Sequence, residues 1–134
     1  MCDGLKRIKK RKVRAYKIVA VKNGRYYSPA MGCLYPMEGD IPIIEEQDKI
    51  VLSFKDGILE SQCFKKELVG RTSGFASRID AERVGALWIH STLLGYTLQV
   101  KEIILTKGLM SGVYKYHAFH FLTVYAGKHI EFLD

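Results

Sequence analysis

The stretch KRIKKRKVR at positions 6–14 carries seven basic side chains within nine residues. Lys and Arg side chains neutralise phosphates and release the counterions condensed on a nucleic acid, and this gain in free energy does not depend on base sequence. An Arg guanidinium can also bind a phosphate through two parallel hydrogen bonds. The alternative is a solvated segment that keeps the protein soluble or acts as a targeting signal. The candidate phosphate-binding residues in this stretch are Lys6, Arg7, Lys9, Lys10, Arg11, Lys12 and Arg14.

The basic charge of the chain is concentrated in this stretch. The chain has 134 residues and a formal net charge of +7. Residues 1–14 contribute +6, from seven Lys/Arg and one Asp, whereas residues 15–134 contribute +1, from fourteen Lys/Arg and thirteen acids. This asymmetry favours an anionic partner for the N-terminal segment rather than for the surface as a whole. Apolar residues make up 48% of the chain and charged residues 26%, a balance typical of a globular domain.

Tyrosines stand beside basic residues at several places, and Arg25-Tyr26-Tyr27 is the clearest example. Aromatic rings next to cations on an exposed sheet face are stacking platforms for unpaired bases. Arg25, Tyr26 and Tyr27 therefore join the candidate nucleic-acid-binding residues. The alternative is that these rings belong to the core, because aromatic residues favour strands in any case.

The sequence contains no strong catalytic, cofactor or metal signature. It has no GxSxG elbow and no glycine-rich phosphate loop that opens a helix. His117 and His120 lie three residues apart in what reads as one strand, so their side chains would point to opposite faces and share no metal. Cys2, Cys33 and Cys63 have no CxxC spacing, which predicts reduced thiols in a cytoplasmic protein. We therefore expect a non-enzymatic protein without a cofactor or a bound metal.

No apolar run approaches the roughly 20 residues of a membrane-spanning helix, so no membrane partner is expected. The elements that must position the basic and aromatic residues begin with a strand over 13–21. One face of this strand is predicted to carry Val13, Ala15, Lys17, Val19 and Val21. A two-residue hairpin turn at positions 23–24, Asn-Gly, and a returning strand over 26–28 follow.

The rest of the chain predicts a long loop, several strands and one helix. Residues 29–48 hold all three prolines and read as a loop, and residues 58–70 fit a strand or a short helix equally. The helix is predicted over about 80–94, with Asp80 as its cap and Gly95 at its end. Further strands are predicted over 49–54, 97–106, 116–126 and 129–133.

This order of elements contains no repeated βαβ unit. It predicts an α+β fold, a single domain over 13–134 with a mostly antiparallel, curved sheet and one main helix. Residues 1–12 are predicted to form a basic leader in front of that domain.

Part of the chain resembles a known group. RAYKIVAVKNGRYYS (14–28) is similar to the opening of small, largely uncharacterised phage and bacterial domains that begin with a Tyr-Lys strand and an Asn-Gly hairpin. In that group a Gly-Phe segment leads into a helix and then into a strand rich in Val and Glu. GFASRIDAERVGALW (74–88) and QVKEIIL (99–105) stand in those places. The resemblance covers about half the chain and implies no activity.

The same half loosely resembles the ADP-ribosyltransferase fold. This resemblance implies that Arg14, Ser73 and Glu131 would hold a dinucleotide. The chain departs from that pattern because it lacks a Ser-Thr-Ser segment, and because His129 stands where the family has Glu or Gln.

Three functions are therefore compared, in order of preference. The first is a small basic binding module whose leader contacts nucleic acid or a nucleoprotein. The second is a phage-type inhibitor or adaptor that binds a protein partner through the loop at 29–48 and through exposed tyrosines. The third is an ADP-ribosyltransferase-like enzyme.

Overall fold

The computed structural model of the protein describes residues 3–30, 33–38, 41–42, 50–51, 71–86, 95–117 and 120–133. Within these residues one helix, α2, spans Arg78–Gly85. The strands are β1 (Asp3–Arg7), β2 (Lys12–Lys22), β3 (Arg25–Ala30), β4 (Cys33–Glu38), β5 (Ile41–Pro42), β6 (Ile50–Val51), β7 (Thr72–Phe75), β8 (Thr97–Thr106), β9 (Met110–His117), β10 (His120–Gly127) and β11 (His129–Phe132).

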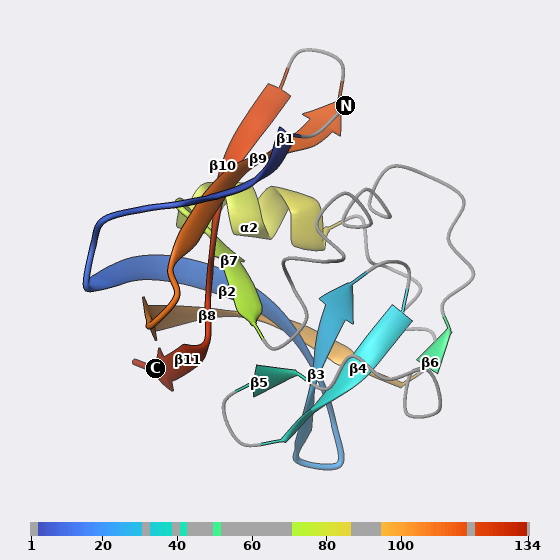
Figure 1. The fold of residues 1–134 in the computed structure, drawn as a ribbon. Coiled ribbons are helices and arrows are strands. Elements are labelled where there is room, and N and C mark those ends of the chain that lie inside the picture. Colours follow the sequence, from blue (N-terminus) through green and yellow to red (C-terminus); the bar gives the residue numbers. More distant parts are fainter. Residues whose placement is uncertain are drawn as a thin grey trace.

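The strands pair in a branched, antiparallel arrangement. The main path runs β1-β9-β10-β7-β2-β3-β4-β5, while β8 pairs with the other edge of β2 and carries β11, and β6 pairs with β4. Figure 1 shows the long, curved β2 passing between the layer of β1, β9 and β10 and the pair of β3 and β4. A mostly antiparallel sheet with one helix in the described residues confirms the predicted α+β class.

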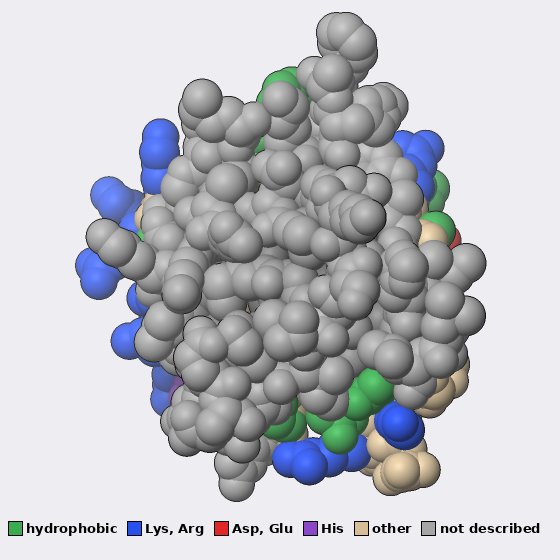
Figure 2. Space-filling view, turned by 90° about the vertical axis from the view of Figure 1, so that its right-hand side faces the viewer, with side chains coloured by type: hydrophobic (Ala, Val, Ile, Leu, Met, Phe, Trp, Pro, Cys, Tyr) green, Lys and Arg blue, Asp and Glu red, His purple; other side chains and the backbone are tan. Residues whose placement is uncertain are grey.

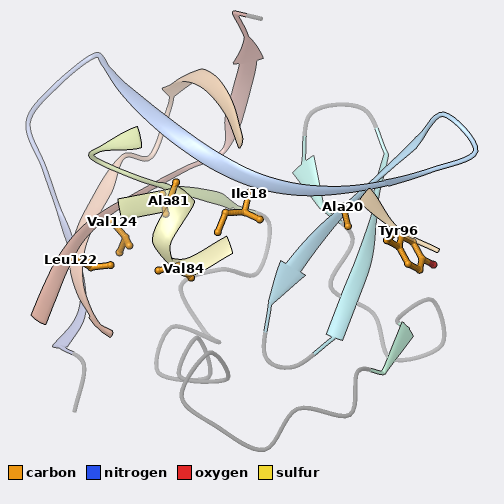
Figure 3. Packing of buried hydrophobic residues seen from close by; sticks show 8 residues of the cluster. Ile18, Ala20, Ala81, Val84, Tyr96, Leu122 and Val124 are labelled. Carbon is orange, nitrogen blue, oxygen red and sulfur yellow. The ribbon is translucent and has the colours of Figure 1, made fainter. Parts of the chain in front are cut away.

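One hydrophobic core lies between the sheet and α2. Ile18 of β2 and Leu122 and Val124 of β10 lie around Ala81 and Val84 of the helix (Figure 3). These five side chains are at most 7% exposed. Buried and more exposed positions alternate along residues 121–126 of β10, and its even-numbered residues in this region are the buried ones that face the helix.

A second core lies against the opposite face of β2. It contains Val13 and Ala15 from β2 and Ile103 and Leu105 from β8, whose Cα positions pair directly across the two strands. Ile130 of β11 and Leu109 complete the buried cluster. The central strand β2 is therefore buried on both faces along much of its length, which fixes its two ends relative to the rest of the molecule.

The predicted hairpin after the first long strand is confirmed. Asn23 and Gly24 connect β2 to β3 with φ angles of 54° and 75°. Two successive residues with positive φ define the tight turn whose twist matches paired strands, and Asn and Gly tolerate that conformation best.

The helix begins earlier than predicted. Ser77, and not Asp80, is the N-cap, and the Ser77 hydroxyl accepts a hydrogen bond from the Asp80 backbone N–H at 3.5 Å. Both residues are good caps, but Ser77 has the extended backbone that a cap requires, with φ −128° and ψ 137°. The helix then runs to Gly85 rather than to position 94, and residues 87–94 lie outside the described part of the chain.

The prediction of a loop over residues 29–48 is wrong for part of this segment. β3 continues through Pro29 to residue 30, and β4 pairs with it, with Tyr27 opposite Pro36 and Ser28 opposite Tyr35. Proline lacks a backbone N–H, but a strand can hold it where that N–H is not needed for pairing. The surface that the protein-binding hypothesis assigned to this loop is therefore partly sheet.

The strand predicted over 116–126 is also wrong, because two strands meet within it. β9 ends at His117 and β10 begins at His120, and these two residues pair across the strands. The two histidines are therefore neighbours on adjacent strands, not two positions of one strand. The predicted strands at 97–106 and 129–133 are confirmed by β8 and β11.

Only a small part of the region from 49 to 70 is described. Residues 50–51 form β6, which pairs with β4, and this agrees with the strand predicted over 49–54. The remainder of that strand, and the ambiguous segment at 58–70, lie outside the described residues.

The start of the chain takes part in the sheet. β1 pairs with β9, with Lys6 opposite Ser111 and Arg7 opposite Met110. The next residue, Ile8, donates its backbone N–H to the Leu109 carbonyl at 3.1 Å. The division of the chain into a leader at 1–12 and a domain at 13–134 stays a prediction. Residues 3–7 nevertheless pair with β9, and Ile8 bonds to the residue that precedes it.

Gly74 of β7 packs closely on β2. A Cβ atom at this position would lie 3.1 Å from both the Ala15 Cβ and the Tyr16 carbonyl oxygen. We expect Gly74→Ala to lower the free energy of unfolding by about 1–3 kcal/mol, because backbone and core atoms must move to admit the methyl group. Urea denaturation measures this. Gly85→Ala is the matched control, since its Cβ would meet Ile18 at an ordinary 3.8 Å and alanine favours helices; equal losses in both variants would contradict the prediction.

Candidate nucleic-acid interface

The turn between β8 and β9 forms the centre of the candidate site. Lys107 and Gly108 both have positive φ angles, of 60° and 59°, so the chain turns tightly here between two strands that do not pair with each other. The Gly108 carbonyl accepts a hydrogen bond from Arg71 Nε at 3.1 Å. The Lys107 carbonyl accepts one from the backbone N–H of Lys128 at 2.8 Å. Three basic residues from three segments thus meet at one turn.

The basic N-terminal segment runs beside this same turn. On one side of it, Arg7 pairs with Met110 and Ile8 bonds to Leu109. On the other side, Lys12 pairs with Thr106, the last residue of β8. The connection from β1 to β2, residues 8–11, must therefore pass around the turn at Lys107 and Gly108.

We call the resulting set of residues the basic end. Apart from the half-buried Arg71, every side chain in it is exposed. Figure 2 shows several Lys and Arg side chains along the left edge of the molecule, with others at the bottom and at the upper right of the view. The basic end consists of Lys6, Arg7, Lys9, Lys10, Arg11, Lys12, Arg71, Lys107 and Lys128.

Arg14 is the one candidate of the stretch at 6–14 that pairs with an acid among the described residues. Its Nε lies 3.8 Å from a carboxylate oxygen of Glu102, and the two side chains are 62% and 25% exposed. The same carboxylate accepts a hydrogen bond from the Tyr16 hydroxyl at 3.3 Å. The positive charge of Arg14 is partly compensated, which sets it apart from the basic end.

Arg25, Tyr26 and Tyr27 lie at the opposite end of β2. Lys12 begins this strand and Lys22, the partner of Arg25, ends it, so the two ends are up to about 33 Å apart along the strand. The structure therefore does not bring the ten predicted residues into one site.

The two tyrosine rings of this second group are packed against other side chains. Tyr27 contacts the buried Tyr96 edge to face, with ring centroids 5.1 Å apart, and the Arg25 guanidinium lies over its ring at 5.6 Å. Tyr26 contacts Phe132 in the same way at 5.7 Å. Both tyrosines are half-buried, and Tyr27 packs against the first core, as the alternative to a stacking platform expects for this ring.

The three residues implied by the ADP-ribosyltransferase resemblance lie on three different strands. Arg14 on β2 and Glu131 on β11 are both in register with Ile104 of β8, which lies between them. Ser73 is on β7, beyond the other edge of β2. Three strand spacings, about 14 Å across the sheet, therefore separate the strand of Ser73 from the strand of Glu131.

The Ser73 backbone carbonyl instead accepts a hydrogen bond from a buried lysine, which was not among the residues predicted from sequence to be functional. Lys17 is 3% exposed, and its Nζ donates a hydrogen bond to this carbonyl at 3.0 Å. Burial lowers the pKa of Lys17 from 10.5 to about 7, because the charged ammonium loses its hydration. The signal was in the sequence, since Lys17 alternates with apolar residues on one predicted face of its strand.

A groove of about 400 Å³ lies between the last turn of α2 and the start of β8. Its lining is mostly apolar, with Glu82 as its one charged side chain, and contains none of the predicted site residues. Within the described ranges, no group of three or more His, Cys, Asp or Glu residues is placed to hold a metal ion. The described part of the chain also contains no helix long and apolar enough to cross a membrane.

Lys107, Lys128 and Arg71 are the residues of the basic end that sequence reasoning missed. They are isolated cations in the sequence, and only the pairing of β1 with β9 and of β2 with β8 brings them to residues 6–12. A comparison with protein-family models, with curated proteins and with solved structures finds no match to this chain.

Proposed function

We propose that this protein is a non-enzymatic module that binds nucleic acid, free or within a nucleoprotein, through the basic end. The observation that carries this proposal is the convergence of Arg71, Lys107 and Lys128 on the turn that residues 6–12 surround. Nine basic residues from four segments of the chain thus occupy one end of the sheet.

The charge arrangement suits a phosphate backbone. Each cation that neutralises a phosphate releases condensed counterions, so a surface with many cations gains affinity that falls steeply with salt. None of the exposed lysines of the basic end forms an ion pair within the described residues. Their charges are therefore available to a ligand.

The pairing of β1 supports a binding role over that of a solvated tail. Lys6 and Arg7 are held along β9 by the strand, and Lys12 is held along β8. Cations that are already placed lose less conformational entropy on binding than cations on a free tail. The basic end therefore spends little of its interaction energy on ordering its own backbone.

The proposal is tested by the salt dependence of binding to a labelled oligonucleotide, measured by fluorescence anisotropy. The triple substitution Lys9→Gln, Lys10→Gln, Arg11→Gln removes three exposed charges from the connection between β1 and β2 and leaves both strands intact. We expect it to weaken binding for all sequences and to lower the slope of log K against log salt by roughly three.

A truncation is a poorer test, because deleting residues 1–12 would also remove β1 and the first residue of β2. Circular dichroism and the melting temperature serve as controls for folding of the triple variant. The proposal is wrong if the intact protein shows no binding at 50 mM salt, or if its affinity does not change with salt.

A further inference from the structure

Phe121 of β10 is a large apolar side chain that lies 60% exposed. Along β10 the side chains alternate between the two faces of the sheet. Leu122 and Val124 are buried and point toward α2 (Figure 3). Phe121, Thr123 and Tyr125 therefore point to the face away from the helix, and Thr123 is exposed there as well.

This face continues across β9 onto β1. Tyr125 is paired with Ser111 of β9, and Ser111 with Lys6 of β1. Residues paired across antiparallel strands place their side chains on the same face, so these three form one row. Lys6 is exposed and belongs to the basic end. We call the face carrying Lys6, Ser111, Phe121, Thr123 and Tyr125 the outer face.

Tyr125 is half-buried because it packs against the second core, which also contacts Ile8. The second core therefore holds the ring in place, while part of the Tyr125 side chain remains accessible to solvent. Phe121 lies four residues away on the same strand, about 13 Å along it. At that spacing, an extended ligand lying along β10 can contact both aromatic rings.

We infer that the outer face binds single-stranded nucleic acid, with bases stacked on Phe121 and Tyr125 and phosphates bound by the basic end. This inference rests on the proposed function and adds to it the form of the nucleic acid that is bound. Bases can stack on a protein ring only when they are unpaired, because in a duplex their faces are covered by neighbouring base pairs.

Charge complementarity supports this occupant over a protein segment. Lys6 belongs both to the outer face and to the basic end, so a single nucleic-acid strand can contact both surfaces. An anionic chain with exposed aromatic bases matches both properties of the surface.

The test compares Phe121→Ala with the intact protein in anisotropy measurements on labelled U10, T10 and a 10-base-pair DNA duplex. We expect the substitution to weaken binding of the single strands by roughly 5- to 100-fold, the range for loss of one base–aromatic stack. Duplex affinity and the salt slope should change by less than twofold. Ile79→Ala is the matched control, since Ile79 is also 60% exposed but lies on α2.

The outcomes separate this inference from the proposed function. Salt-dependent binding by the intact protein together with equal single-strand affinity in Phe121→Ala would overturn the inference alone, as would equal losses for single strands and duplex. An absence of any nucleic-acid binding would overturn both. A second variant, Phe121→Trp, should show quenched indole fluorescence on addition of U10 or T10 and not of the duplex; unchanged fluorescence would also count against stacking.

Discussion

Replacing Lys17 with methionine should raise the free energy of unfolding at neutral pH. The substitution should also remove much of the change of this free energy with pH between pH 7 and pH 10. Lys17 is 3% exposed and has one hydrogen-bond acceptor, the Ser73 carbonyl. Methionine has a similar length and no charge to desolvate, while the carbonyl that loses its donor costs about 1–2 kcal/mol. The gain from the missing charge is larger than this loss.

The direction follows from the lowered pKa of Lys17, about 7 in the folded protein against 10.5 ordinarily. Below pH 7 both states carry the proton, and the folded state bears the full cost of a buried ammonium. Between pH 7 and 10.5 the unfolded state binds more protons, so stability rises with pH. Above 10.5 both states are neutral and the cost is gone. The full difference amounts to about 5 kcal/mol.

Urea denaturation of both proteins at pH 7, 8, 9 and 10 checks this prediction. The two free energies should differ most at pH 7 and converge as the pH rises. Lys12→Met is the control, because Lys12 lies on the same strand and is exposed. Parallel pH profiles for the intact protein and Lys17→Met would show that the Lys17 ammonium is hydrated in the folded state, contrary to its burial.

The parts of the fold that could be predicted from sequence are those set by local chemistry. Asn23 and Gly24 determine a turn because few other residues adopt two positive φ angles in succession. The strand at 97–106 has enough β-branched and apolar residues to be recognised without its partners. Ser77 and Asp80 show the limit, since both can cap a helix and only the backbone at Ser77 decides between them.

The missed strands depend on partners distant in sequence. Pro29 and Pro36 indicate a loop locally, yet β3 and β4 pair around both of them. The boundary between β9 and β10 follows His117 without a glycine or a proline, so the sequence there reads as one continuous strand. Such boundaries are set by which residues find partners in the sheet, and pattern alone does not reveal this.

The candidate site shows the same division. The cations at 6–12 are visible as a run, whereas Lys107 and Lys128 each stand beside a glycine in a short turn and carry no binding signal of their own. Their contribution depends on the bond between the Lys128 N–H and the Lys107 carbonyl and on the pairing of Lys12 with Thr106. The variant that separates the basic end from a simple basic tail must therefore change these two residues.

The double substitution Lys107→Glu, Lys128→Glu should weaken nucleic-acid binding by about 100-fold at 0.1 M salt. Each lysine is exposed and reaches a phosphate only if the ligand lies against the turn at Gly108. Loss of two charge-assisted contacts of about 1.5 kcal/mol each gives this factor. Each lost phosphate contact also lowers the salt slope by about one. A basic segment acting alone, as a tail, would lose far less.

Anisotropy titrations over a range of salt concentrations measure this, with Lys22→Glu, Arg83→Glu as the charge-matched control. Both control residues are exposed, one at the far end of β2 and one on α2, and the net charge changes by the same amount. If the two double variants lose affinity equally, the attraction comes from the net charge of the whole protein and the basic end is no site. If only the first loses affinity, the ligand lies at the turn between β8 and β9, where residues 6–12 hold its phosphates from both sides.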